Sequence, residues 1–181
     1  PISLQLCLMT AQIGNGGYSI KPKIIVNNDP LNFTEAKKNM EEQYLINSNS
    51  QLFKDKKNIK IIQQAMFSST NEIGGTSYRS RIDNLKYQFA GKTGTAQVKR
   101  ISKRERELDL KIDQIPYKNR DHALYVAFGP YKNPRYALSI IVEHGGSGSK
   151  AAAPMAKKLF KLIIDRDKLR EKQPNFEEIS I

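Results

Sequence analysis

Ala90-Gly91-Lys92-Thr93-Gly94-Thr95-Ala96-Gln97-Val98 is the stretch from which the fold of this 181-residue chain can be argued. It places a lysine, a hydroxyl residue and a glycine in a row, inside a segment (residues 87–98) that reads as a β-strand. By residue frequencies alone, a Lys-Ser/Thr-Gly triplet arises by accident in roughly one chain in ten of this length. The triplet therefore gains meaning only from the segments around it.

The composition fits one globular domain with a core of its own, at 39% hydrophobic residues. A net charge of +12 permits binding to nucleic acid, anionic lipid or another anionic polymer, and does not choose among them. One cysteine (Cys7) and two histidines (His122 and His144) cannot build a structural zinc site, so we expect no metal and no cofactor. We interpret Cys7 as a buried, unreactive thiol. Because Pro1 enters a helical pattern directly, without Met or a leader, we expect the chain to derive from something longer.

Hydrophobic periodicity and turn residues predict an α+β fold. The predicted helices are residues 1–13, 55–68 and 151–164, with a short one at 77–82, and the predicted strands are residues 18–26, 87–98, 122–128 and 135–143. The last two strands should form an antiparallel hairpin. In the last helix, capped by Ser149, we expect one apolar set inside, formed by Met155, Leu159, Leu162 and Ile163. Residues 27–51 and 99–120 are predicted to be loops, the first with a helical turn near 35–42, and residues 166–181 a charged C-terminal tail.

Six segments follow one another in an order that can be compared with a known family. They are Pro1-Ile2-Ser3-Leu4-Gln5-Leu6, Asn15-Gly16-Gly17 with Lys21-Pro22, Gly75-Thr76-Ser77-Tyr78, residues 91–97, residues 121–130, and residues 142–148 followed by Ala152-Ala153-Pro154. In that order they resemble the T-P-L-Q-L, N-G-G…P, G-T-A, K-T-G-T, D-H-A-L-F-x-A-F-A-P and E-x-G-G-x-G segments of the class B penicillin-binding proteins. The likeness is strongest to their elongation-specific branch, penicillin-binding protein 2, and it covers residues 1–165.

The resemblance implies a penicillin-binding-protein/β-lactamase-like transpeptidase domain, a five-stranded antiparallel sheet with helices on both faces. This chain would hold three of the five strands, the C-terminal half of the domain. The implied activity is that of a D,D-transpeptidase, which cross-links peptidoglycan stem peptides by serine acyl transfer and binds β-lactams. The family's first two motifs, S-x-x-K and S-x-N, would lie before Pro1, so we expect the chain alone to be inactive. Ser147-Gly148-Ser149-Lys150 and Ser69-Thr70-Asn71 match those patterns in the wrong order, and we interpret both as coincidence.

The same resemblance assigns roles to four residues of the opening stretch. Lys92 is the expected catalytic residue, a fixed positive charge beside the serine. Thr93, Gly94 and Thr95 are the expected substrate-binding residues: Thr93 by its hydroxyl, Gly94 by leaving room, and Thr95 by a backbone N–H that forms half of an oxyanion hole. Without its neighbours, the same stretch would be an exposed strand with a glycine bulge.

Other polar residues receive structural interpretations. His122 should set the base of the hairpin, and Glu143 and His144 should point to opposite faces of a strand, which argues against a shared catalytic pair. Residues 99–120 are either a solvated connection or a lip beside the cleft that meets partner proteins or glycan.

The implied partners of the parent protein are a glycosyltransferase and elongation-complex proteins, at the inner membrane with this domain outside the cytoplasm. We expect no nucleic-acid partner, and self-association of the fragment through an exposed sheet edge. Two alternatives remain: a noncatalytic penicillin sensor or scaffold, and a basic nucleic-acid-binding module suggested only by the charge.

Overall fold

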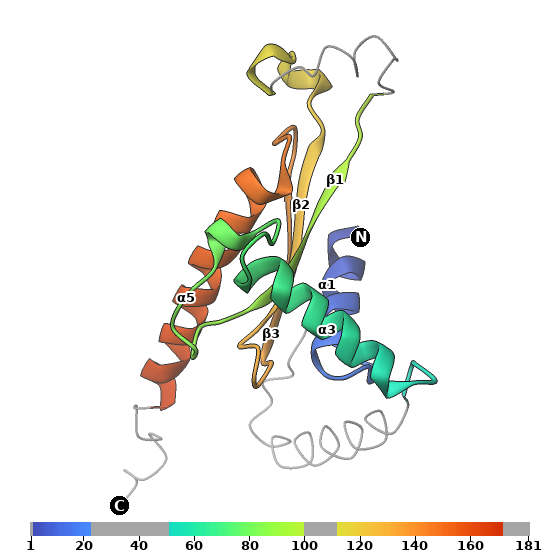
Figure 1. Ribbon diagram of the computed structural model, residues 1–181, viewed down its shortest axis with the longest axis vertical. Helices are drawn as coiled ribbons and strands as arrows, with labels where there is room; N and C mark the ends of the chain where they lie inside the picture. Colours follow the sequence, from blue (N-terminus) through green and yellow to red (C-terminus); the bar gives the residue numbers. More distant parts are fainter. Residues whose placement is uncertain (1, 23–50, 100–111, 172–181) are drawn as a thin grey trace, which may run out of the picture.

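The computed structural model describes residues 2–22, 51–99 and 112–171 (Figure 1). Its helices are α1 (Ile2–Gly14), α3 (Lys56–Asn71) and α5 (Ala153–Glu171), and short helical turns lie at η2 (Tyr78–Ser80), η3 (Ile112–Gln114), η4 (Tyr117–Asn119) and η5 (Gly148–Ala152). Strands β1 (Ala90–Ala96), β2 (His122–Gly129) and β3 (Tyr136–Val142) form one antiparallel sheet in the order β1-β2-β3. The predicted α+β fold with a three-stranded antiparallel sheet and flanking helices is therefore confirmed.

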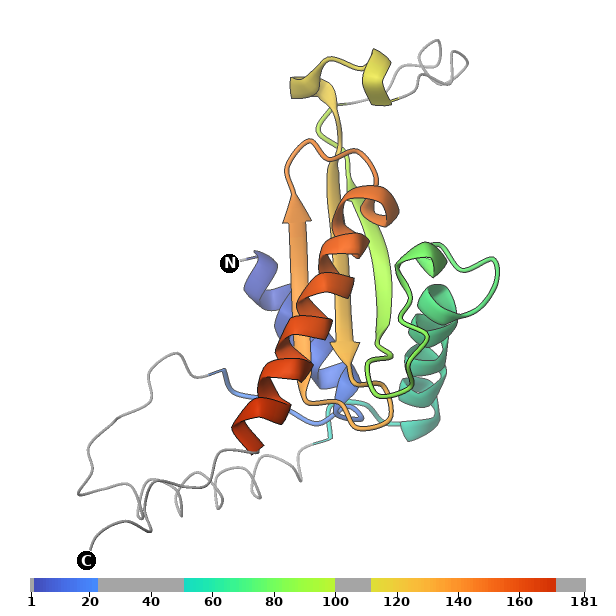
Figure 2. The same ribbon diagram turned by 90° about the vertical axis from the view of Figure 1, so that its left-hand side faces the viewer.

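The sheet separates two apolar layers (Figure 2). Helix α5 crosses one face, where Phe89 stacks on Phe160 with ring centroids 4.8 Å apart. Helix α1 covers the other face, where Ile13 packs with Ala90, Phe128 and Met66 of α3. Figure 2 also shows α3 beside β1, so part of the outer side of β1 has a helical neighbour.

Helix α5 faces the sheet with a different set of residues from the one predicted. The buried set consists of Ala153, Ala156, Phe160 and Ile164, preceded by Ala152 at the end of η5, whereas Met155, Leu159 and Leu162 are exposed by 46%, 40% and 66%. Small alanines let the helix lie close to the sheet, and a single large ring then fills the remaining space. The prediction followed the largest apolar residues, which was wrong because alanine burial carries little periodic signal.

Several boundaries also differ from the predictions. Helix α3 has the predicted cap, since Asp55 accepts a hydrogen bond from the N–H of Lys57 at 2.8 Å. The predicted Ser149 cap is wrong, because Ser149 lies within the π-helical turn η5 that leads into α5. The described part of the predicted strand 18–26 shows only an isolated bridge from Tyr18 to Gln51. The other predictions for these parts of the chain lie outside the described residues. They are the remainder of that strand, the helical turn near residues 35–42 and most of the 99–120 loop.

The division of the chain at residue 165 stays a prediction. Helix α5 itself continues to Glu171, and Asp167 pairs with Arg135 at the start of β3 at 3.5 Å. Among the described residues, no helix is both long and apolar enough to cross a membrane.

Candidate active-site edge of the sheet

Strand β1 forms one edge of the described sheet, and its outer side is closed at only one end. The hydroxyl oxygen of Thr70, on α3, accepts from the N–H of Gly91 at 3.1 Å and lies 3.4 Å from the Gly91 carbonyl. Alternate residues of an antiparallel strand direct their N–H and C=O groups to the same side. The backbone groups of Thr93 and Thr95 therefore also face outward, beyond the point where α3 covers the edge (Figure 1).

The ammonium group of Lys92 lies at this open edge. Lys92 pairs with Val126 across the sheet, so both side chains rise from the face that α1 covers. The Lys92 Nζ then donates to the Thr93 carbonyl oxygen at 2.8 Å and lies 3.5 Å from the Thr93 hydroxyl. The side chain is exposed, so its positive charge faces solvent, and the described residues form no ion pair with it.

An apolar hollow of about 640 Å³ opens beside Lys92. It lies between α1 and α3, and its walls are formed mainly by Met9, Ile13, Ile62, Met66 and Val126. Ser69, Glu72 and Thr76 supply the polar groups of the lining. The lysine thus has an apolar surface on one side and the strand edge on the other.

A buried group of hydroxyls holds β1 against α3 from beneath. The Tyr125 hydroxyl lies 2.9 Å from that of Thr70 and 3.0 Å from that of Ser77, and all three side chains are at most 1% exposed. Burial raises the pKa of Tyr125, an effect that exceeds the lowering by its hydrogen bonds to Ser77 and Thr70. Tyr125 therefore stays neutral, and it fixes the position of the residue before Lys92.

The other predicted site residues also lie along β1. The Thr93 hydroxyl lies 3.3 Å from that of Thr76. At Gly94 a Cβ would lie 3.3 Å from the Leu124 Cβ, a tight contact that a small shift of this one side chain would relieve. The structure thus brings Lys92, Thr93, Gly94 and Thr95 together on one open strand edge.

The histidines lie at the end of the hairpin opposite its turn, where His122 pairs with Ala96 across the sheet, one position beyond Thr95. The Nδ1 of His122 accepts from the N–H of His144 at 3.0 Å, and His144 has a positive φ of 54°. The Nδ1 of His144 lies 2.9 Å from the carbonyl oxygen of Arg120. These bonds shape the turn after β3, which agrees with the structural interpretation of His122.

Neither matching serine pattern is arranged as a nucleophile. The Ser147 and Ser149 hydroxyls contact each other at 3.0 Å, in the turn on the α5 side of the sheet. Asn71 donates to the carbonyls of Phe67 and Phe89, at 3.0 and 2.9 Å, and so serves packing. Cys7 contacts the Ala137 carbonyl at 3.5 Å, and burial raises the pKa of its thiol.

Sequence reasoning did not identify Thr70, Ser77 and Tyr125 as supports of the site. They lie on three separate segments, and each type of residue is common on protein surfaces. One signal was present: the G-T-A-like segment includes Ser77, whose hydroxyl contacts that of Tyr125, and Thr76, whose hydroxyl contacts that of Thr93.

Comparison with known proteins identifies the family of this chain. A family model described as the penicillin binding protein transpeptidase domain matches residues 3–161. The chain therefore belongs to the penicillin-binding protein transpeptidase family.

Two curated relatives indicate which members of the family this chain resembles. The peptidoglycan D,D-transpeptidase MrdA of Salmonella typhimurium LT2 is 38% identical over 105 residues, covering 58% of this chain and 16% of its own length. MrdA of Haemophilus influenzae is 29% identical over 170 residues, covering 85% of this chain and 25% of its own. The chain thus spans about a sixth to a quarter of the length of these curated relatives.

Two solved structures show the same fold. The penicillin-binding protein PBP2 of Helicobacter pylori, in complex with MreC, has a TM-score of 0.63 at 28% identity, covering 91% of this chain and 25% of that one. PBP2 of Pseudomonas aeruginosa has a TM-score of 0.60 at 27% identity, covering 88% and 30%. The resemblance to the elongation-specific branch is confirmed.

Proposed function

We propose that this chain supplies the third motif of a serine D,D-transpeptidase that cross-links peptidoglycan stem peptides. One observation carries the proposal: the Lys92 ammonium, the Thr93 hydroxyl and the Thr95 backbone meet on the open outer edge of β1. An extended stem peptide, or a β-lactam, pairs with that edge through its backbone.

Each residue then has a distinct task. A serine oxygen attacks the carbonyl of the penultimate D-Ala, the peptide bond to the terminal D-Ala breaks, and an amine of a second stem peptide takes the acyl group from the serine. Lys92 provides positive charge and a donor to the serine hydroxyl and the substrate carboxylate. Thr93 binds that carboxylate, and Gly94 leaves space for the peptide to approach. The N–H of Thr95 stabilises the oxyanion.

The nucleophile comes from outside these 181 residues in this proposal. One support is that the two segments of this chain that match the S-x-x-K and S-x-N patterns make structural contacts. The Ser147 and Ser149 hydroxyls contact each other, and Asn71 donates to two backbone carbonyls. Support also comes from the relatives, whose matched segments are a sixth to a quarter of their length. The apolar hollow beside Lys92 gives the serine-bearing segment a place to pack.

The relatives support a proposal for the setting of the parent protein. The H. pylori relative was solved in complex with MreC. We infer that the complete protein works in an elongation assembly with a glycosyltransferase, anchored in the inner membrane with this domain outside the cytoplasm. The charge of +12 needs no nucleic-acid partner in that setting.

Labelling with fluorescent penicillin followed by a denaturing gel tests the proposal. The 181-residue chain should remain unlabelled, while a polypeptide that adds the upstream S-x-x-K and S-x-N segments should carry a covalent label. A labelled 181-residue chain would contradict the external nucleophile. An unlabelled longer polypeptide would favour the alternative of a noncatalytic relative.

A further inference from the structure

Two neighbouring residues at the end of α3 reach two alternate positions of β1. Thr70 contacts Gly91 directly. Ser69 contacts the Thr76 hydroxyl at 3.0 Å, and Thr76 contacts the Thr93 hydroxyl at 3.3 Å. The Thr93 hydroxyl is therefore the end of a series of hydroxyls that begins on a helix.

The turn that carries Thr76 is fixed on both sides. Before it, a Cβ at Gly75 would lie 2.5 Å from the Ser69 carbonyl oxygen, so only glycine permits this approach. After it, the N–H and hydroxyl of Ser77 both donate to the Ser69 carbonyl at 3.0 Å. Thr76 thus has little freedom to move away from Ser69.

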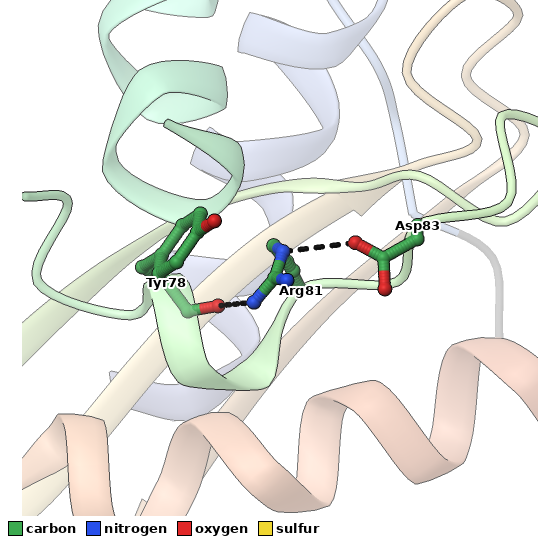
Figure 3. Close-up of polar contacts among 3 residues, drawn as sticks. All are labelled: Tyr78, Arg81 and Asp83. Atoms are coloured by element: carbon green, nitrogen blue, oxygen red, sulfur yellow. Dashed lines mark hydrogen bonds and ion pairs between the residues drawn. The ribbon is translucent and has the colours of Figure 1, made fainter. Parts of the chain in front are cut away.

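The segment after the turn is held as well (Figure 3). Arg81 lies over the Tyr78 ring at 4.0 Å and pairs with Asp83 at 2.9 Å. Its Nη1 donates to the Tyr78 carbonyl at 3.4 Å. Such surface contacts are individually weak, but they close η2 beside Thr76.

The direction of one hydrogen bond to the Thr93 hydroxyl is set by its donor. An ammonium can only donate, so the Lys92 Nζ uses one acceptor position of the Thr93 hydroxyl. If the Ser69 hydroxyl donates to that of Thr76, and the Thr76 hydroxyl donates to that of Thr93, the second acceptor position of the Thr93 hydroxyl is used as well. The proton of Thr93 is then left for an acceptor at the open edge, and aligned hydroxyls strengthen one another.

We propose that Thr76, supported by Ser69, is a positioning residue that orients the Thr93 hydroxyl toward the carboxylate of a stem peptide or β-lactam. This inference rests on the proposed function and adds residues that none of the expected motif roles included. Ser69, Thr76 and Lys92 all line the hollow beside β1, so the series lies at the site rather than behind it.

The test measures acylation of the polypeptide that includes the upstream segments, by benzylpenicillin and by its methyl ester. Thr76→Val removes the hydroxyl and keeps the shape, and should lower the acylation efficiency of benzylpenicillin about two- to tenfold. Acylation by the ester, which lacks the carboxylate charge, should not change. Thr76→Ser should restore the wild-type ratio between the acylation efficiencies of the two compounds. Ser69→Ala should lower the acylation efficiency of benzylpenicillin as well, but by less than Thr76→Val.

The ratio between the two compounds separates positioning from folding. An equal loss with both compounds, or a Thr76→Ser variant that fails to restore the ratio, would mean a structural role and overturn the inference. A Thr76→Val variant with the wild-type ratio would overturn it too. Wild-type protein acylated by neither compound would overturn the proposed function, and this inference with it.

Discussion

A Cβ atom at Gly91 would lie 2.2 Å from the hydroxyl oxygen of Tyr125, a side chain that is fully buried beneath β1. The residue before Lys92 is therefore glycine because the tyrosine occupies the space of a side chain. The contact between the two residues therefore fixes the position of β1, which carries the site, relative to the Tyr125 side chain.

Gly91→Ala should destabilise the fold by about 1–3 kcal/mol, because the strand or the tyrosine must move to admit the methyl group. Urea unfolding followed by circular dichroism measures the difference. Gly94→Ala is the matched control, since its Cβ would meet only the Leu124 Cβ at 3.3 Å, and it should cost less. Equal losses in the two variants would contradict this account of Gly91.

Tyr125 should make the fold sensitive to alkali. Burial raises the pKa of Tyr125 in the folded state, so its contribution to stability is complete below the unfolded pKa of about 10 and is lost as the pH rises above it. Tyr125→Phe should cost about 1 kcal/mol at neutral pH through its lost hydrogen bonds. The melting temperature of this variant should then fall less steeply than that of the wild type above pH 10. If the melting temperatures of the two proteins fell equally steeply above pH 10, Tyr125 would not be a source of the loss of stability in alkali.

The corrected orientation of α5 can be tested with two alanine variants. Phe160 is fully buried and stacks on Phe89, so Phe160→Ala should cost about 3–5 kcal/mol through the cavity it leaves. Leu162 is 66% exposed, so Leu162→Ala should change stability by no more than about 0.5 kcal/mol. Chemical denaturation compares the two, and the opposite ranking would restore the orientation that the sequence predicted.

The chain in isolation should self-associate. In the described sheet β3 is the second edge, and exposed apolar side chains such as Ile73, at 90%, and Ile61, at 65%, lie on and after α3. Unpaired edges and apolar surface favour contact between copies. Light scattering should therefore report species larger than the monomer, and a monodisperse monomer would argue against this expectation.

The sequence predicted the sheet well, because its signals are local. The runs that became β2 and β3 are apolar and are separated by Gly129 and Pro134, which mark a turn. The strand with Lys92 was recognised from its motif and its neighbours in order. Family membership could be predicted because six segments kept their order over residues 1–165.

The supports of the site could not be predicted, because they depend on contacts between distant segments. Thr70 and Tyr125 are 55 residues apart, and no periodic pattern links them. The inward face of α5 was predicted wrongly for a related reason. Its burial depends on alanines and on one phenylalanine that stacks on a residue from another element.

Lys92, on the open edge of β1, is proposed to assist a serine supplied by the upstream part of the protein. The rate of labelling by fluorescent penicillin in the longer polypeptide tests it directly, with Lys150→Ala as the matched control from the decoy S-x-x-K pattern. We predict that Lys92→Ala lowers the acylation rate at least about 100-fold, a loss comparable to that of an oxyanion donor, while Lys150→Ala leaves the rate unchanged. Wild-type labelling of the Lys92→Ala variant, or loss of labelling in the Lys150→Ala variant, would contradict the account.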